Sequence, residues 1–366
     1  MPPWTLLTDL FNTLREVDLN AIRREAEQPV QIALVAAPGP AREALLSPPD
    51  ASPGLPPPAP AVVLYEPTLP DLADRLASAD LILLLPHNAE VAVAALLTEL
   101  LSRRWPGRRR PPLLVCAPPT AVGEWPAEVT LFCDLEEPEA LSRHLAPAML
   151  ARLEGKALAA ARRLPLLRER YARDLIAEVA VSNALYALST GLAEVVPILD
   201  LPLNVADVVV LTKNQAMMAY RLALAMGLEA DWRQTVPDLA AVVGGGFLWR
   251  QVARQLVGLI PVWGLVPKVA VAYAGTYATG QAIYHWCATG RKLETEELKA
   301  LYQQALAEGR KVASRLIEQA KREDRLRLPR PRLRRGRRCP SCGERNPRDA
   351  LFCAYCGTSL EGRASS

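Results

Sequence analysis

The stretch QIALVAAPGPARE at residues 31–43 decides the fold of the N-terminal third of the chain. It begins with an apolar run, and a Gly/Pro turn separates this run from charged, helix-favouring residues. Helical patterns alternate with further apolar runs at residues 61–65, 81–85, 112–116 and 129–132. Such alternation is typical of a parallel sheet. Residues 28–150 are therefore predicted to form an α/β domain on the plan of a nucleotide-binding fold.

The turn after the first predicted strand lacks the chemistry of a P-loop. A P-loop reads G-x4-G-K-[ST], in which backbone amides, a lysine and a hydroxyl hold phosphates and magnesium. The corresponding positions in this chain are Ala36, Ala41, Arg42 and Glu43. Glu43 would bring a negative charge toward the phosphates. The missing glycines also remove the conformational freedom that the loop needs.

Two later landmarks of GTPases are replaced as well. Residues 66–69 read EPTL where a metal-binding D-x-x-G would stand, and residues 117–120 read APPT where a guanine-reading N-K-x-D would stand. The pattern predicts a degenerate, GTPase-like (P-loop-like) α/β domain for which nucleotide is not expected as a partner. An unrelated Rossmann-like fold would give the same order of strands. A divergent GTPase with an atypical P-loop is a further alternative.

The middle of the chain resembles a bacterial protein family through LTKNQAMMAYRLALAMG (211–227), VVGGGFLWRQVARQLVGLIPVWG (242–264) and VAYAGTYATGQAIY (271–284). These stretches are similar to the YcjF-like domain of unknown function 697, which is often joined to a GTPase domain. The resemblance implies an all-α helical domain, assigned here to residues 155–325, and brings no activity with it. The family's recurring positions fall on Thr212, Asn214, Gln215, Gly244 to Gly246, Arg250, Arg254, Gln255, Pro261, Gly264, Thr276 and Gly280.

The apolar character of the helical region raises the question of membrane insertion. A spanning helix needs about 20 mostly apolar residues, and only the uncharged run at 269–290 is long enough. We expect a membrane-associated or partly inserted bundle at the cytoplasmic face of the cell membrane, with a wholly soluble, cytoplasmic bundle as the alternative. Cys116, Cys133 and Cys287 stand singly without partner spacing, which suits a reducing compartment.

Charge and proline set off segments at both ends of the chain. Residues 1–27 interleave apolar and charged positions, which predicts an amphipathic helix. The net charge of +4 is uneven, because residues 321–366 hold 13 Lys/Arg against 5 Asp/Glu. Residues 326–338 read LRLPRPRLRRGRR and are predicted to form a basic linker. This linker is either a solvated spacer or a contact for anionic lipid heads or nucleic acid phosphates.

The C-terminal cysteines have the spacing of a zinc ribbon over residues 339–360. They lie in two knuckles, CPSCG and CAYCG, where Gly343 and Gly357 can take the positive φ that a tight turn requires. Four thiolates close a tetrahedral shell and leave no open position, so the expected cofactor is structural zinc; two disulfides are the alternative. The predicted metal ligands, in a C-x2-C-x10-C-x2-C pattern, are Cys339, Cys342, Cys353 and Cys356.

No catalytic constellation is found in the sequence, since His87, His144 and His285 have no metal-ligand spacing and neither G-x-S-x-G nor H-E-x-x-H occurs. The chain is therefore expected not to be an enzyme. The leading hypothesis is a membrane-associated scaffold or regulatory protein whose ribbon binds an unknown protein partner, with an anionic membrane surface as a second partner. The alternative is a soluble nucleic-acid-associated protein that uses the arginine-rich tail and the ribbon.

Overall fold

The computed structural model describes most of residues 19–327 and, after them, a few residues between 337 and 346. The chain divides into two compact units, Met1–Ala313 and Ser314–Ser366. Of the predicted N-terminal helix, Leu19–Glu27 is described as helix α2, and its residues 1–18 lie outside the described part. The described residues are 19–46, 61–105, 110–121, 125–134, 137–153, 155–193, 205–228, 265–327, 337–338, 343 and 345–346.

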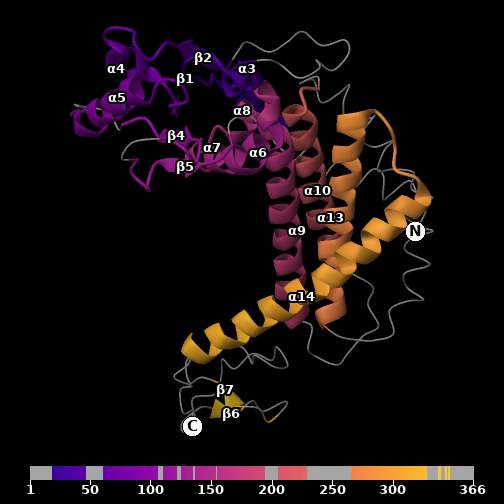
Figure 1. The fold of residues 1–366 in the computed structure, drawn as a ribbon. Coiled ribbons are helices and arrows are strands. Elements are labelled where there is room, and N and C mark those ends of the chain that lie inside the picture. The colour runs from indigo at the N-terminus through magenta and orange to yellow at the C-terminus, as the bar shows by residue number, and fades with distance from the viewer. Residues whose placement is uncertain are drawn as a thin grey trace. The chain divides into compact units, whose positions relative to one another are not determined.

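A five-stranded parallel sheet forms the N-terminal region, which confirms the prediction of a parallel α/β arrangement. The strand order is β2-β1-β3-β4-β5, and every neighbouring pair is parallel. The three central strands are buried along their whole length, as expected for a parallel sheet that is covered on both faces. The strands are β1 (Ile32–Ala36), β2 (Val62–Tyr65), β3 (Leu81–Leu85), β4 (Leu113–Ala117) and β5 (Thr130–Phe132) (Figure 1).

The two faces of this sheet carry separate hydrophobic cores. Successive residues of a strand point to opposite faces, so Leu34 belongs to one core and Val35 to the other. One face is covered by α4 (Leu72–Arg75), a 3₁₀ turn (Leu76–Ser78) and α5 (Glu90–Ser102). The opposite face is covered by α2, α3 (Pro40–Leu46), a π turn (Leu141–Leu145), α7 (Ala146–Arg152) and α8 (Ala157–Arg163), and the short helix α6 (Pro138–Ala140) leads into the π turn.

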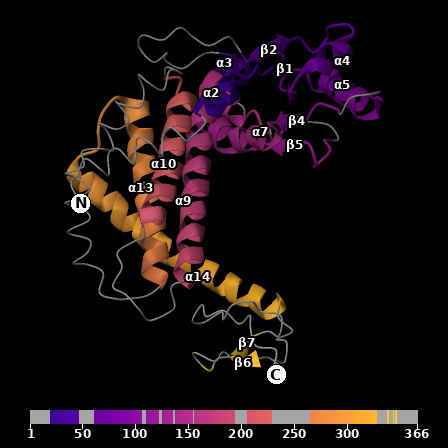
Figure 2. The same ribbon diagram turned by 180° about the vertical axis from the view of Figure 1, so that it is seen from behind.

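Three long helices follow a 3₁₀ turn (Pro165–Leu167): α9 (Arg168–Ala193), α10 (Val205–Ala225) and α13 (Leu265–Thr289). They lie side by side in both views, and α13 packs most extensively against α9 (Figures 1 and 2). Gly290 ends α13, because its φ of 70° and its N–H bond to the Trp286 carbonyl cap the helix. The chain then enters α14 (Thr295–Arg327).

The α/β region and the bundle share one core within the unit Met1–Ala313. The cluster that contains Leu34 of β1 also contains Tyr171 of α9 and Tyr220 of α10. Polar contacts reinforce this packing: Arg221 on α10 binds Glu25 on α2 at 2.7 Å. Burial raises the pKa of Tyr171 to about 12, so this phenol stays protonated beside that pair.

The 269–290 run that the sequence offered as a membrane span falls in α13. Within the described part of the chain, no helix is both long enough and apolar enough to cross a membrane.

Helix α14 makes a close backbone approach to α13 at Gly309. A Cβ atom placed on Gly309 would lie 2.7 Å from the carbonyl oxygen of Ala270 and 3.2 Å from the Tyr273 ring. Backbone atoms cannot rotate out of the way as a side-chain end can. A Cβ at this position therefore forces the two helices apart.

Replacing Gly309 with alanine is expected to lower the free energy of unfolding by about 1–3 kcal/mol, because overpacking outweighs the gain in helix propensity. Gly275→Ala on α13 is the matched control, since nothing lies within 4 Å of a Cβ there. That control should gain about 0.5–1 kcal/mol from propensity alone. Urea unfolding of the full chain measures both values. Shifts of the same sign in the two variants would contradict the close approach.

Candidate functional site

The helix that follows β1 forms an ion pair with the segment that follows β2. Arg42, in the first turn of α3, donates from Nη1 to Oε1 of Glu66, just beyond β2, over 3.0 Å. These are the two positions at which a P-loop lysine and a metal-binding aspartate would stand in the sequence comparison. Each charge is the nearest partner of the other at a partly exposed site, which lowers the charge that the loop presents to a phosphate or a metal ion.

Little space is left beside this loop. The hollow there has a volume of about 10 Å³, which is about enough for one water molecule. A Cβ on Gly39 would touch the His87 ring at 3.5 Å, so the turn already packs against the end of β3. As it stands, this hollow is smaller than a di- or triphosphate. The hollow is lined by Ala37, Gly39, Pro40, Ala41, Arg42, Leu85 and His87.

Several recurring positions of the YcjF-like resemblance meet in the core of the helical bundle. Asn214 and Gln215 on α10 lie with Thr276 on α13 around Asn183 of α9. Asn183 donates to Thr276 over 2.8 Å and accepts from Asn214 over 2.7 Å. Gln215 donates to Thr276 over 3.2 Å, and Thr276 donates to the Ala272 carbonyl over 2.9 Å.

This polar cluster joins the three helices rather than opening a site. Asn183 and Thr276 are fully buried, and they meet one another's hydrogen-bonding needs. Gly280, another recurring position, lets Ile176 of α9 approach closely, since a Cβ would lie 2.7 Å from Ile176 Cγ1. The side chain of Thr212 is not described. The positions at Gly244 to Gly246, Arg250, Arg254, Gln255, Pro261 and Gly264 lie outside the described residues.

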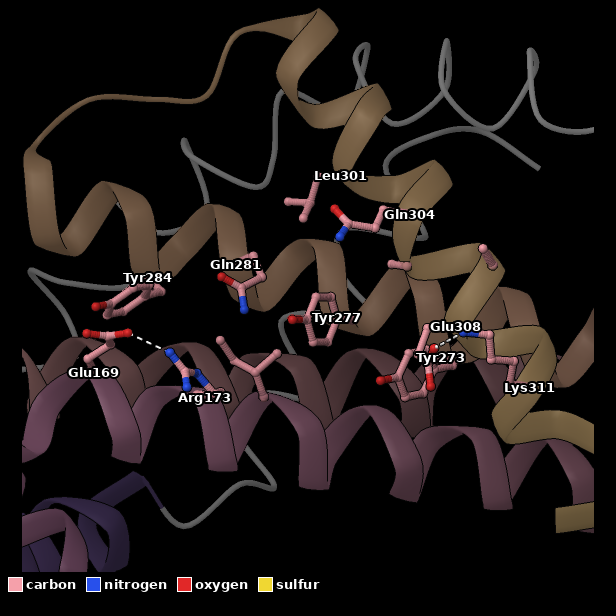
Figure 3. A pocket seen from close by; sticks show the side chains of 13 residues that line it. Glu169, Arg173, Tyr273, Tyr277, Gln281, Tyr284, Leu301, Gln304, Glu308 and Lys311 are labelled. Carbon is pink, nitrogen blue, oxygen red and sulfur yellow. Dashed lines mark hydrogen bonds and ion pairs between the residues drawn. The ribbon is translucent and has the colours of Figure 1, made fainter. Parts of the chain in front are cut away.

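A polar pocket of about 610 Å³ lies between α9, α13 and the first part of α14 (Figure 3). Tyr273, Tyr277 and Tyr284 project from α13 toward it, together with Gln281, while Gln304 comes from α14. The rings of Tyr273 and Tyr277 stack, with centroids 5.9 Å apart. Sequence reasoning did not single out this pocket, although the aromatic spacing at residues 273, 277 and 284 follows one helix face.

The charges that line this pocket neutralise one another. Glu169 pairs with Arg173 at 2.6 Å on α9, and Glu308 pairs with Lys311 at 3.0 Å on α14. Burial, with the Glu169 carboxylate as a second cause, raises the pKa of Tyr284, so its hydroxyl stays neutral. The described lining therefore offers phenols and amides, which suit a neutral hydrogen-bonding ligand better than an ionic one.

The predicted metal ligands, Cys339, Cys342, Cys353 and Cys356, lie outside the described residues, as does Gly357. The first knuckle is framed by β6 (Arg337–Arg338) and β7 (Arg345–Asn346), which pair antiparallel. Gly343 has a φ of 76°, which confirms the positive φ expected after the second cysteine. Four cysteine donors are a ligand set that suits a zinc ion. Elsewhere in the described ranges, no cluster of His, Cys, Asp and Glu could hold a metal.

Cys116 and Cys133 stand singly in the sequence, and in the structure both are free cysteines that lie side by side. The two side chains meet in the core with their sulfur atoms 2.7 Å apart, because β4 and β5 are neighbours in the sheet. Cys287 on α13 is half-buried, and burial raises its thiol pKa to about 12. Spacing along the chain carries no signal for a pair that is formed by sheet register.

Comparison with known families identifies a zinc-ribbon domain at residues 338–360. This match agrees with the predicted ribbon and implies structural zinc binding. Neither the YcjF-like family nor a GTPase family is matched by the body of the chain. No curated protein and no solved structure matches the chain.

Proposed function

We propose that this chain is a non-catalytic scaffold or regulatory protein whose C-terminal zinc ribbon binds a partner protein. The Arg42–Glu66 ion pair is the observation that carries the non-catalytic part. It joins the two side chains best placed to hold a phosphate and a metal, beside a hollow of about 10 Å³. An α/β region built in this way supports the rest of the body and does not turn over nucleotide.

The ribbon supplies the binding part of the proposal. Four thiolates fill the tetrahedral shell of zinc, so the metal has no open position for a substrate or an activated water. Its contribution is folding free energy for a segment that is too short to build a core of its own. The family match at residues 338–360 supports this reading of the tail. A small domain held by its metal presents a fixed surface to a partner.

Phosphate release from Mg–GTP and Mg–ATP tests the non-catalytic assignment. The zinc-loaded full chain should release phosphate no faster than buffer, and Arg42→Ala should match the parent. Release above buffer that disappears in Arg42→Ala would show that the ion pair opens to form a working site. That outcome would replace the scaffold with an atypical nucleotidase.

A second candidate function, association with nucleic acid, is favoured by the arginines around the first knuckle. Arg337 and Arg338 lie on β6, and Arg338 pairs in register with Arg345 on β7. They continue the arginine run that begins at Arg330. Arginines neutralise phosphates regardless of base sequence. An anionic membrane surface would attract the same arginines. We therefore also propose that this segment can associate with a membrane.

Salt dependence separates these readings of the tail. If phosphates are bound, the affinity of the full chain for a single-stranded oligonucleotide should fall with a log–log slope of about −0.7 for each phosphate neutralised. Replacing Arg337 and Arg338 with serine should reduce that slope. Binding to phosphatidylserine vesicles without oligonucleotide binding would assign the run to a membrane. If the chain binds neither the oligonucleotide nor the vesicles, only the proposed binding of a partner protein remains.

A further inference from the structure

The buried cysteines of β4 and β5 form a pair that the proposed function does not use. Cys116 lies opposite Leu131 in the β4–β5 register, and Cys133 lies two residues farther along. Because side chains alternate between the faces of a strand, Leu131 and Cys133 share a face with Cys116. The Cys133 N–H donates to the Ala117 carbonyl over 3.0 Å and extends the ladder to this point. Backbone hydrogen bonding therefore holds the two thiols together.

The two sulfur atoms are 2.7 Å apart and contact each other directly. Cys116 is 0% exposed and Cys133 is 4% exposed, and both belong to the hydrophobic core on one face of the sheet, with the Asp134 carboxylate next to Cys133. They lie at the edge of the sheet, since β5 is its last strand. Only a small, uncharged reagent can approach such a pair. We propose that Cys116 and Cys133 are a redox-active dithiol, which a peroxide converts to a disulfide between β4 and β5.

The two thiols differ in a way that assigns their roles. The hydrogen bond from the Cys116 thiol lowers the pKa of Cys133, because it stabilises the thiolate. The hydrogen bond to Cys133 and burial raise the pKa of Cys116, which keeps its proton. The thiolate is the nucleophilic form of cysteine. Cys133 is therefore the residue that reacts first, and Cys116 is the resolving thiol.

The reaction balances with hydrogen peroxide as the oxidant. The Cys133 thiolate attacks one peroxide oxygen, the O–O bond breaks, and hydroxide leaves while Cys133 becomes a sulfenic acid. The Cys116 sulfur then attacks the Cys133 sulfur, the S–O bond breaks, and the hydroxyl group leaves as water with the Cys116 proton. The hydroxide takes up the proton originally lost by Cys133. Two thiols have then lost two electrons and two protons, and one peroxide has become two waters.

The experiment is a disulfide map of the zinc-loaded full chain after brief exposure to hydrogen peroxide, followed by alkylation and proteolysis. Two free thiols should be lost, and one linked peptide should join Cys116 to Cys133, lighter by two hydrogen atoms than its reduced parts. A dithiol reductant should restore both thiols. Zinc content, measured on the same sample, should stay unchanged, which shows that the ribbon cysteines did not contribute. Full alkylation of Cys116 and Cys133 after oxidation would overturn the proposal.

Variants separate the two roles. Cys287→Ser is the matched control, because it removes a half-buried cysteine elsewhere and should leave the linked peptide intact. Cys116→Ser should stop the reaction at the Cys133 sulfenic acid, which a dimedone-type reagent traps. Cys133→Ser should leave Cys116 reduced under the same exposure. Oxidation of Cys116 in that variant would overturn the assignment of the first nucleophile. The map of the unaltered chain decides the disulfide itself, even if a variant folds poorly.

Discussion

Cys342→Ser is expected to release the zinc of the full chain and to unfold the ribbon at residues 339–360. Removing one of four thiolates opens the closed shell and leaves three ligands for an ion that needs four. Structural zinc contributes about 10–16 kcal/mol of apparent binding free energy in zinc-finger peptides at neutral pH. A segment of this size has no core that could replace such a contribution.

Metal analysis and limited proteolysis check this expectation together. The parent chain should carry one zinc and resist cleavage in its tail, whereas Cys342→Ser should carry none and be cut there rapidly. The unit Met1–Ala313 should keep its melting temperature, because its own cores contain none of the four ligands. Cys287→Ser is the control for the loss of a cysteine as such. Full zinc occupancy in Cys342→Ser would exclude it as a ligand.

Asn183→Ala is expected to destabilise the helical bundle by about 1–3 kcal/mol, because a partly buried donor loses its partner and a small cavity is opened. The lost partners are Asn214 Nδ2 at 2.7 Å and Thr276 Oγ1 at 2.8 Å. Thr276 keeps its bonds to Gln215 and to the Ala272 carbonyl. The Asn214 amide, which loses the bond to Asn183, therefore carries much of the cost.

Ser189→Ala on the same helix is the matched control, since its hydroxyl bonds the Tyr186 carbonyl at an exposed position. It should change the free energy of unfolding by less than about 0.5 kcal/mol. Chemical unfolding followed by circular dichroism measures both variants. Equal stabilities for Asn183→Ala and Ser189→Ala would mean that the polar cluster contributes no net stability to the bundle.

The parallel sheet could be predicted because its signal is local. Each central strand is a short, fully apolar run, and a run of this kind needs cover on both faces. The ribbon was predictable for the same reason, since metal-ligand spacing lies within a few residues; its family match begins one residue before the predicted start at residue 339. Patterns of this length need no knowledge of the fold.

The side-chain contacts between segments that are distant in the sequence could not be predicted from such patterns. Arg42 and Glu66 were each recognised as replacements, but their pairing depends on β1 lying beside β2. Cys116 and Cys133 meet only through the β4–β5 register. Asn183 has no sequence signal, and its polar partners follow only from the packing of α9 against α10 and α13. Predicting contacts between distant segments requires knowledge of the strand order and of the helix packing.

The claim that the loop after β1 binds no nucleotide is tested most directly by a calorimetric titration of the zinc-loaded full chain with Mg–GTP. We expect only the heat of dilution, because Arg42 is paired with Glu66 and the hollow beside the turn is small. Glu66→Gln, which frees the arginine while the turn stays packed, should behave in the same way. A saturable heat in the parent chain that Arg42→Ala abolishes would contradict this claim, because it would show that nucleotide binds at this loop.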